Sequence, residues 1–346
     1  MKEITKNKKP LVSVNMVSFN SEKYIAESIQ SILNQTYKNF ELIIVNDGST
    51  DNTLREINNF NDSRIVIINN KNNFGIPHSR NIALRASNGK YIAIQDSDDV
   101  SLKERLHIQV NYLENNLKFG LVGSLAIGID QDGKTLNRKQ SLGLNSRETK
   151  VMIFFRNCFT HSTIMYRKNK LKKIYFDQKF KITQDYDAII KIARDSKIKN
   201  IDEALIMYRF HENSISQNLR DKEEEEKIII GSQLEKLGIS NTKKNIIAHK
   251  KFKIRTIHKN LGLIFAQLGL LEKLLLGNQE HKILPEPEFS NRLVRYWNNI
   301  MSSSSQYSLK LLGFYINSRF IKLSNRTYKS HILFFFRCLT GFNIKF

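Results

Sequence analysis

Cysteines, long apolar runs and paired glycines are scarce in this chain, and each scarcity excludes a class of protein. The 346 residues include two cysteines, Cys158 and Cys338, so no disulfide framework is implied and a reducing cytosol is the natural compartment. The most apolar stretch, Leu261 to Leu276, is interrupted by polar residues and is shorter than the ~18–20 residues of a spanning helix. No two glycines stand two positions apart, which argues against a dinucleotide-binding oxidoreductase. We expect a chain without a secretion signal that does not cross a membrane.

Acidic residues are also few compared with basic ones. The 55 Lys and Arg residues exceed the 33 Asp and Glu residues, which gives a formal net charge of +22. Such an excess favours a polyanionic partner, which could be nucleic acid, anionic lipid or a phosphorylated substrate. Charge alone does not choose among these three.

The first hundred residues alternate short apolar runs with helical patterns. The expected strands span residues 11–19, 40–45, 64–68 and 91–95, with a helix capped by Ser21 after the first and a helix starting near Pro77 before the fourth. This alternation predicts an α/β fold with a parallel, doubly wound sheet, whose ligands bind at the carboxyl ends of the strands.

The rest of the chain has a different pattern. Between residues 120 and 220 it is more mixed, with strands expected near 121–127, 161–166 and 204–209 and helices near 146–156 and 184–195. After residue 220 the pattern is helical, and Pro285 and Pro287 mark a linker within this part. We therefore expect two domains, residues 1–220 and 221–346.

Three carboxylates gather at the end of the fourth expected strand. They are Asp96, Asp98 and Asp99 of the segment QDSDD, and their mutual repulsion would be relieved by a divalent cation. Oxygen ligands of this kind suit Mg²⁺ or Mn²⁺, which can also grip a diphosphate as it leaves. The alternative is a solvated acidic turn that caps the helix expected after Ser101.

A second polar segment, VNDGSTDNT, follows the second expected strand. Gly48 permits a tight turn after Asp47, and Ser49, Thr50 and Asp51 can cap the next helix. Taken alone, this segment is compatible with an ordinary turn and cap.

Together the two segments resemble the family 2 glycosyltransferases, of the class that builds bacterial surface polysaccharides. The resemblance rests on VSFNSEKYIAESIQSILNQTYKNFELIIVNDGSTDNT (residues 17–53) and NNFGIPHSRNIALRASNGKYIAIQDSDD (residues 72–99). It implies a Rossmann-like GT-A nucleotide-binding domain, here followed by a helical extension. It implies that the nucleotide-sugar is bound by Ser18, Asn20, Asp47, Arg80 and Asp96, and that Asp98 holds Mn²⁺ or Mg²⁺. This sequence differs from the family pattern at Asn46, where an acidic residue is common, and at Gln95, where a leucine is common.

Three later segments extend the resemblance. KITQDYDAIIKIA resembles the region of the family's catalytic base, which makes Asp185 the implied base, at an expected helix start where the helix dipole favours a carboxylate. RFHENSIS resembles a segment whose histidine, here His211, contacts the metal or diphosphate, and FTHSTIMYRK resembles an acceptor-side strand in which His161 is a weaker candidate. Each of these residues could instead be an ordinary helix-start acid or surface histidine.

The implied reaction is an inverting displacement that moves a sugar, most simply from a UDP-sugar, onto a glycan or lipid-linked acceptor. The alternatives are a nucleotidyltransferase, a nucleic-acid-binding protein and a non-catalytic subunit. The first would need a glycine-rich basic loop after the first strand, and the basic residues are too dispersed to indicate the second. The segment GIDQDGKT has the letters of a phosphate-binding loop, but Asp132-Gly133 favours a hairpin.

The end of the chain is basic and aromatic. From Phe289 onward there are nine Lys or Arg residues and no Asp or Glu, and the segment ILFFFRCLTGF (residues 332–342) suits an interfacial helix. We expect this region to hold a cytoplasmic enzyme on the inner, anionic face of the cell membrane. A solvated extension or a homo-oligomer arm is the alternative.

Overall fold

The computed structural model describes residues 9–140, 144–212, 219–252, 260–303, 309–324 and 328–340. The chain divides into two compact units. The first consists of Met1–Ile153 and Asn157–Glu225, and the second of Phe154–Arg156 and Glu226–Phe346. Each unit is described separately below.

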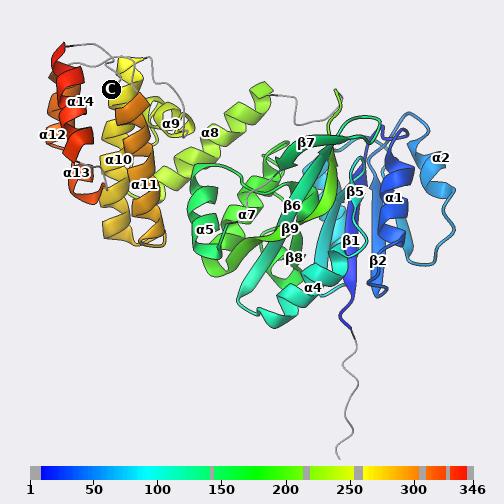
Figure 1. Ribbon diagram of the computed structural model, residues 1–346. Coiled ribbons are helices and arrows are strands. Elements are labelled where there is room, and N and C mark those ends of the chain that lie inside the picture. Colours follow the sequence, from blue (N-terminus) through cyan, green and yellow to red (C-terminus); the bar gives the residue numbers. More distant parts are fainter. Residues whose placement is uncertain are drawn as a thin grey trace, which may run out of the picture. The chain divides into compact units, whose positions relative to one another are not determined.

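The first unit begins with four parallel strands in the spatial order β3-β2-β1-β4 (Figure 1). The strands are β1 (Val12–Ser18), β2 (Phe40–Asn46), β3 (Ile65–Asn69) and β4 (Tyr91–Asp96). The connecting helices are α1 (Ile25–Leu33), α2 (Thr53–Asn58) and α3 (Ile76–Ala86). The strand–helix alternation of the sequence is therefore confirmed, and the carboxyl ends of β2, β1 and β4 lie next to one another.

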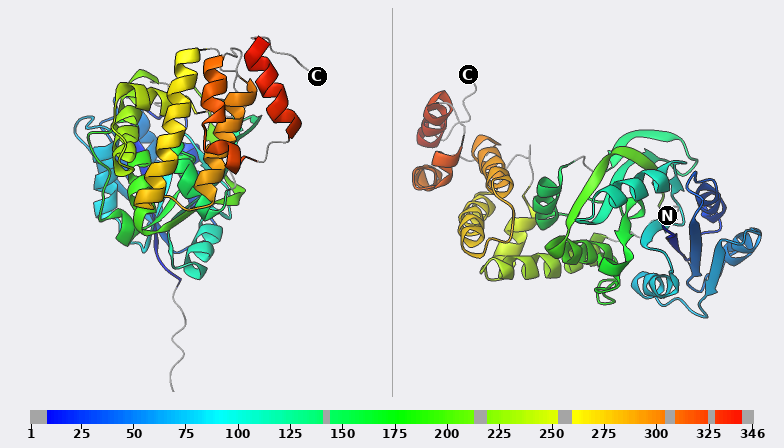
Figure 2. Two further views of the ribbon diagram at one scale, coloured as in Figure 1. Left: turned by 90° about the vertical axis from the view of Figure 1, so that its left-hand side faces the viewer. Right: turned by 90° about the horizontal axis from the view of Figure 1, so that it is seen from below.

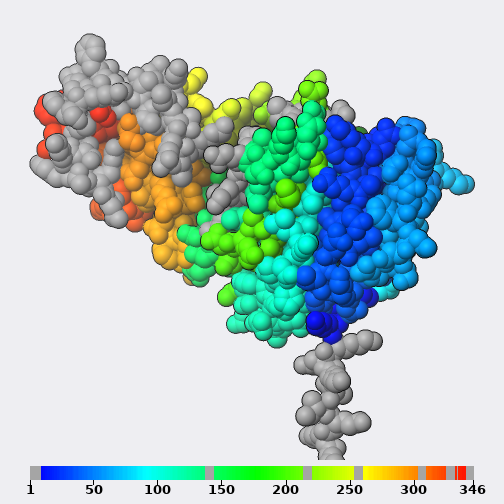
Figure 3. Space-filling view, turned by 45° about the vertical axis from the view of Figure 1, so that its right-hand side comes forward, coloured from blue at the N-terminus to red at the C-terminus, as the bar shows by residue number. Residues whose placement is uncertain are grey.

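The remaining strands extend this sheet into a mixed one, in the order β4-β8-β6-β9-β5, with β7 paired to β6. They are β5 (Val100–Ser101), β6 (Phe119–Ile129), β7 (Thr135–Gln140), β8 (Met165–Arg167) and β9 (Lys197–Arg209). Strand β8 runs antiparallel to both β4 and β6, whereas β6 and β9 are parallel. In the space-filling view the parallel part (blue to cyan) and the later strands (green) adjoin in one body (Figure 3).

Helices cover this second half of the sheet. They are α4 (Arg105–Asn115), α5 (Ser146–Phe155), α6 (Lys168–Leu171) and α7 (Gln184–Asp195), with a 3₁₀ turn at His161–Thr163. The α/β class with a Rossmann-like sheet is thus confirmed.

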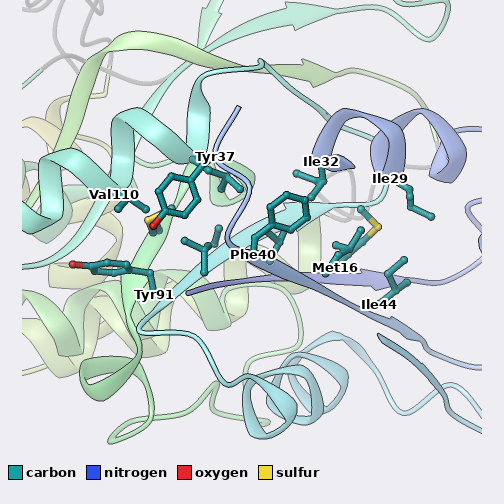
Figure 4. Packing of buried hydrophobic residues seen from close by; sticks show 14 of the residues in the cluster. Met16, Ile29, Ile32, Tyr37, Phe40, Ile44, Tyr91 and Val110 are labelled. Carbon is teal, nitrogen blue, oxygen red and sulfur yellow. The ribbon is translucent and has the colours of Figure 1, made fainter. Parts of the chain in front are cut away.

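One apolar core lies between the sheet, α1 and α4. Met16 and Ile44 point from adjacent strands toward Ile29 and Ile32 of α1, and Val110 of α4 belongs to the same cluster (Figure 4). These side chains are fully or almost fully buried. Burying a side chain of this size contributes about 1.5–3 kcal/mol, so the cluster fixes the strands whose ends carry the polar residues discussed below.

Three local predictions can be compared with the structure. The strand expected at 161–166 is wrong in its first half, because residues 161–163 form the 3₁₀ turn and the strand begins at Met165. Ser21 does not cap α1, since its hydroxyl bonds to Phe19 O and Ser97 Oγ and the helix begins at Ile25. The hairpin at Asp132-Gly133 is confirmed: Gly133 has φ +83° between the antiparallel strands β6 and β7.

The second unit is helical, as the sequence after residue 220 predicts. Its helices are α8 (Leu219–Lys236, which starts in the first unit), α9 (Lys243–Lys250), α10 (Leu261–His281), α11 (Glu288–Ser303), α12 (Leu309–Ile316), α13 (Phe320–Leu323) and α14 (Tyr328–Thr340). Helices α10 and α11 lie side by side in both further views (Figure 2). The prolines at 285 and 287 lie in the connection between them, as predicted.

By length and composition, α10 passes as a membrane-spanning candidate, contrary to the expectation from its interrupted sequence. However, 56% of its most apolar window is buried inside the protein. Its buried polar residues also bond to neighbouring backbone, with Gln267 donating to Lys251 O and Asn278 to Leu284 O. These features are typical of a core helix in a helical bundle.

Candidate active site at the carboxyl ends of the parallel strands

Strands β1, β2 and β4 end at one edge of the sheet, and the polar segments of the sequence meet there. Ser18 ends β1 and is paired with Asn46 at the end of β2, while Asp96 ends β4. Asp47 N donates to Ser18 O at 2.8 Å, which joins the two strand ends directly. The hydroxyl of Ser18 is buried without a hydrogen-bond partner among the residues that the structure describes.

The carboxylate of Asp47 organises the loop that precedes α3. Asp47 is buried, and it accepts hydrogen bonds from Asn70 Nδ2 (2.8 Å), Phe74 N (3.1 Å) and Gly75 N (2.9 Å). Gly48 follows with φ +70°, and a Cβ there would lie 2.4 Å from the backbone of Asn72. The aspartate and glycine therefore hold this loop against the end of β2, which shapes any pocket at that place.

Asn20 and Asn46 tie the first two strand ends together. Asn20 adopts φ +48°, and its side-chain oxygen accepts from Thr50 N at 2.9 Å. Asn46, at the position where the family commonly has an acid, donates to Asn69 at 2.6 Å and accepts from Ser49 N at 3.3 Å. Asn20 is exposed and Asn46 is buried. Their side-chain oxygens accept from the backbone N–H groups of Thr50 and Ser49, respectively.

Arg80 of α3 pairs with Asp96. Its guanidinium donates to Asp96 Oδ1 at 3.1 Å and lies over the ring of Phe176. Burial raises the pKa of Asp96, the Arg80 charge opposes that rise, and the nearby carboxylates of Asp98 and Asp185 add to it. Asp96, Asp98, Asp185 and Arg80 therefore form one electrostatic cluster, although Asp185 lies 89 positions after Asp96 in the chain.

Asp98 and His211 are the best-placed pair for a metal ion. His211 Nε2 lies 2.8 Å from Asp98 Oδ2, and both side chains are mostly but not fully buried. No group of three or more His, Cys, Asp or Glu residues with metal-site geometry occurs in the described parts of the chain. Mg²⁺ and Mn²⁺ sites often use one or two protein ligands together with substrate phosphates and water, so a carboxylate and an imidazole that meet at a partly open position fit such an ion.

Arg209 locks the turn that carries Asp98. Its Nε donates to Asp98 O at 2.9 Å, its backbone N donates to Asp99 Oδ1 at 2.9 Å, and its guanidinium reaches Glu27 at 2.6 Å. The guanidinium also lies 4.7 Å above the ring of Tyr24, which in turn contacts the ring of His211. Arg209 ends β9 and stands only two positions before His211. The end of β9 therefore positions His211 and, through Arg209, also the turn that carries Asp98.

Gln95 stands where the family commonly has leucine, and its side chain bonds to both ends of the turn that carries Asp98. Its amide donates to Asp96 O at 3.2 Å and to Asp99 O at 2.8 Å, and its oxygen accepts from Arg105 Nη1 at 3.0 Å. Arg105 is fully buried, and this burial lowers its pKa to about 9 against the opposing effect of Asp99 and Asp96. Asp99 itself, which bonds to Ser162, has its pKa raised well above the usual value by burial and by its acidic neighbours. Asp99 is thus a buried structural acid, unlike Asp96 and Asp98.

Asp185 lies in the first turn of α7. Asn157 Nδ2 donates to its Oδ2 at 3.0 Å. Burial raises the pKa of Asp185, while Arg80, the backbone N–H of Tyr186, Lys222 and Asn157 act in the opposite direction. A carboxyl group with a raised pKa is a better proton acceptor when it is ionised, which suits a general base.

His161 lies on the 3₁₀ turn before β8, beside the ring of Phe176 at 6.0 Å. Both of its ring nitrogens are buried and lack a hydrogen-bond partner among the described residues, as does the hydroxyl of Tyr166 on β8. Burial and the charges of Arg80 and Arg105 hold the pKa of His161 well below its usual value, so the ring is neutral. A role in acceptor contact stays a prediction.

The sequence patterns predicted the residues at the strand ends. They did not predict the residues that bond to the site and fix its geometry, which are Arg209, Asn157 and Glu27. Arg209 stood inside the quoted segment RFHENSIS without being singled out, although a long cation two positions before a candidate metal-binding histidine was a usable signal. Asn157 and Glu27 carry no local signal, since an asparagine after a helix and a glutamate in a helix are ordinary.

Comparison with known proteins agrees with this geometry. The sequence model of glycosyl transferase family 2 matches residues 13–175. An uncharacterized glycosyltransferase of Methanocaldococcus jannaschii is 40% identical over 221 residues, which are 62% of this chain and 76% of that protein. The Escherichia coli UDP-Glc:alpha-D-GlcNAc-diphosphoundecaprenol beta-1,3-glucosyltransferase WfgD is 33% identical over 214 residues, 60% of this chain and 80% of that protein.

Among solved structures, Staphylococcus aureus TarS 1-349 in complex with UDP-GlcNAc has a similar fold. The TM-score is 0.56 with 20% sequence identity, over 83% of this chain and 90% of that one. At this identity the likeness concerns the fold, and it extends beyond the residues that the family model covers.

Proposed function

Because this chain belongs to glycosyltransferase family 2 and is therefore a glycosyltransferase, we propose that it is an inverting, metal-dependent enzyme. In this proposal it transfers a sugar from a UDP-sugar to a glycan or lipid-linked acceptor during the synthesis of a bacterial surface polysaccharide. The observation that carries the proposal is that Arg80, Asp98 and Asp185 lie near Asp96 at the carboxyl end of β4, and that His211 pairs with Asp98.

The strand-end residues bind the donor in this proposal. Ser18, Asn20 and Asp47 line the place for the nucleotide, and Arg80 and Asp96 lie next to the diphosphate and sugar. Asp98 and His211 would hold Mn²⁺ or Mg²⁺, and such an ion, when bound, would neutralise charge on the diphosphate leaving group. Arg209 keeps Asp98 and His211 close to each other. Its Nε donates to Asp98 O, and it stands two positions before His211 in the chain.

Asp185 is the proposed base. The acceptor oxygen forms a bond to the anomeric carbon as the bond from that carbon to the nucleoside diphosphate breaks, and the acceptor's hydroxyl proton passes to Asp185. A single displacement of this kind inverts the anomeric configuration, as in glycosidases where a base activates the nucleophile on the opposite face. Asn157 Nδ2 donates to Oδ2 of Asp185 and favours the ionised form of the carboxylate, which is the form that accepts the proton.

The proposed donor and acceptor rest on similarity to a relative of known name and on the net charge of this chain. One relative is named for transfer of glucose from UDP-Glc to a sugar on diphosphoundecaprenol, and we extend the UDP-sugar donor and the lipid-linked acceptor to this chain. The net charge of +22 suits substrates that carry diphosphates on both sides of the reaction.

Incubation with Mn²⁺ and a panel of nucleotide sugars tests the proposal, because slow hydrolysis identifies a donor even without an acceptor. Release of UDP is the expected result. A nucleotidyltransferase would instead release pyrophosphate when a nucleoside triphosphate and a sugar phosphate are supplied, and a nucleic-acid-binding protein would release neither product. Either outcome would refute the proposed reaction.

We also propose that the enzyme is cytoplasmic and is held on the inner face of the cell membrane by its last helices. In α14, Phe334 is buried and stacks on Tyr315 of α12, while Ile332, Phe335, Phe336 and Leu339 are exposed. The exposed positions follow an i, i+3, i+4, i+7 pattern, which forms one stripe along a helix. Apolar side chains on such a stripe, in a segment with basic residues and no acidic ones, suit the interface of an anionic lipid surface. Residues 341–342, at the end of the segment that the sequence predicts to be interfacial, lie outside the described residues.

Charge favours lipid over a second copy of the chain at this surface. The segment from Phe289 to the end carries nine basic and no acidic residues, so two such segments would repel each other. Each basic residue near an anionic bilayer contributes about 1 kcal/mol of attraction. A homo-oligomer through these helices is the competing outcome.

A further inference from the structure

The chain passes between its two units at three points. These points are Ile153 to Phe154, Arg156 to Asn157, and Glu225 to Glu226. The first two points flank the three residues 154–156, and the third lies 68 positions after Asn157. Inside the first unit, the residue on the near side of each point contacts the same place, the start of α7. That place carries Asp185.

The contact of Glu225 is the most extensive of the three. Its carboxylate accepts from the backbone N–H groups of Lys181 (2.7 Å), Ile182 (3.0 Å) and Thr183 (2.8 Å) and from Thr183 Oγ1 (2.9 Å). Glu225 is 8% exposed. A buried carboxylate that accepts from four donors fixes the loop before α7 strongly, because hydrogen bonds to a charged group are stronger than those between neutral groups.

The other two contacts reach the next residues of the helix. Asn157 donates to Asp185 Oδ2 at 3.0 Å and uses its own side-chain oxygen to accept from Phe159 N. The hydroxyl of Tyr186 donates to Ile153 O at 2.9 Å. Residues 181–186 are thus held from the loop through the first turn of α7.

The segments beyond these points, residues 154–156 and the chain from Glu226, are anchored within the helical unit. Phe155 stacks on His249 at 5.3 Å and packs against Tyr296 at 5.0 Å, in a cluster that also includes Phe154. Glu226 pairs with Lys250 at 3.2 Å. Each segment that contacts the start of α7 is therefore continuous with a residue packed into the second unit.

We propose that Asn157 and Glu225 are positioning residues for Asp185, because they hold its side chain and the loop before α7. The inference rests on the proposed role of Asp185 as base. A base must lie within hydrogen-bond reach of the acceptor hydroxyl, and a misplacement of about 1 Å can cost about 10²-fold in rate. Neither residue touches the strand ends where the donor is expected to bind, so donor affinity should not depend on them.

Steady-state kinetics of the full chain test the proposal with Glu225→Ala, Glu225→Gln and Asn157→Ala. The expected result is a fall in kcat of tenfold or more for the alanine variants, with the KM for the donor within twofold of wild type. Glu225→Gln keeps one acceptor oxygen and should fall between Glu225→Ala and wild type. Glu226→Ala, which removes the adjacent carboxylate and its pairing with Lys250, is the matched control and should keep kcat within twofold.

A pH profile separates positioning from a general loss of folding. The groups that face Asp185 are Asn157, Arg80, Lys222, Asp96, Tyr166 and the backbone N–H of Tyr186. The Asn157 hydrogen bond favours the ionised form of Asp185. Asn157→Ala should therefore move the acid limb of the kcat profile to higher pH, which a structural defect alone would not do. If Glu225→Ala fails to fold, Glu225→Gln and Asn157→Ala still decide the question.

The outcomes distinguish this inference from the function on which it rests. If Asp185→Asn keeps a rate within threefold of wild type, the base assignment itself is wrong. If Asp185→Asn is inactive while the Asn157 and Glu225 variants match Glu226→Ala, the positioning inference alone is overturned. A donor KM that rises together with the loss of kcat would also overturn it.

Discussion

His211 Nε2 lies 2.8 Å from Asp98 Oδ2, although 113 positions separate the two residues in the chain. The pair joins the turn after β4 to the end of β9 at the edge where the proposed donor diphosphate lies. It is therefore the most direct place to test the proposed metal dependence.

Metal-dependent UDP binding is the first prediction. Calorimetry should show tighter UDP binding with Mn²⁺ than with EDTA, because the ion would bridge the diphosphate to Asp98 and His211. Asp98→Ala should abolish this difference, whereas Glu22→Ala, an exposed acid on the same unit, should leave it intact. Equal affinity of the wild type for UDP with Mn²⁺ and with EDTA would defeat the metal assignment.

The second prediction concerns Asp185→Asn. Asparagine keeps the size of the side chain but cannot accept the proton, so UDP binding should persist while kcat falls by about 10²-fold or more. Binding is measured by calorimetry and turnover by UDP release. A rate within threefold of wild type would remove Asp185 from the mechanism.

The third prediction is an acid limb in the kcat profile. The pKa of Asp185 is raised above its reference value of 3.8, chiefly by burial. A base works in its ionised form, so kcat should fall as the pH drops through this raised pKa, at a higher pH than for an ordinary carboxyl group. Fluorescence at each pH verifies that the protein is still folded, and a kcat that is constant down to pH 4 would contradict the prediction.

The fourth prediction concerns the stability of the helical unit. His249 is buried among aromatic rings, and burial lowers its pKa to about 3. The unfolded chain therefore binds a proton between pH 6.5 and 3 that the folded chain does not, so stability falls as the pH drops through this window. At pH 5 the loss is about 2 kcal/mol, as an order of magnitude.

His249→Phe should remove this loss, since phenylalanine can stack on Phe155 without a titrating group. Urea unfolding gives the free energy of unfolding at each pH. Relative to wild type, the free energy of unfolding of the variant should rise by about 2 kcal/mol between pH 7.5 and pH 5. The prediction would be refuted if the free energies of unfolding of His249→Phe and wild type differ by the same amount at pH 7.5 and at pH 5.

The fifth prediction tests the exposed stripe of α14. The double change Ile332→Ser and Phe335→Ser removes apolar side chains that are 40% and 44% exposed, so it should weaken sedimentation with vesicles containing phosphatidylglycerol. Binding of the wild type should also fall with salt. Leu117→Ser, which changes an exposed leucine of the first unit, is the control. If the wild type stays in the supernatant at low salt, the membrane role is wrong, and its sedimentation equilibrium then tests the oligomer.

Much of the fold and the strand-end residues could be predicted from the sequence because their signals are local. The alternation of apolar runs and helical patterns predicted β1 to β4, and Asp47, Asp96 and Asp98 stood directly after such runs. Parallel strands bring their carboxyl ends to one edge, so the approximate position of the site follows from the order of elements alone.

Only the tertiary structure decided which residues hold that site together. Glu225 is one of four consecutive glutamates, and nothing local distinguishes it from Glu223, Glu224 or Glu226. Likewise Arg209 reaches Glu27 across 182 positions, and the antiparallel direction of β8 depends on its pairing with β4 and β6. Periodicity reports which side of an element is buried, whereas the partner of a buried charge depends on where the packed core places distant segments.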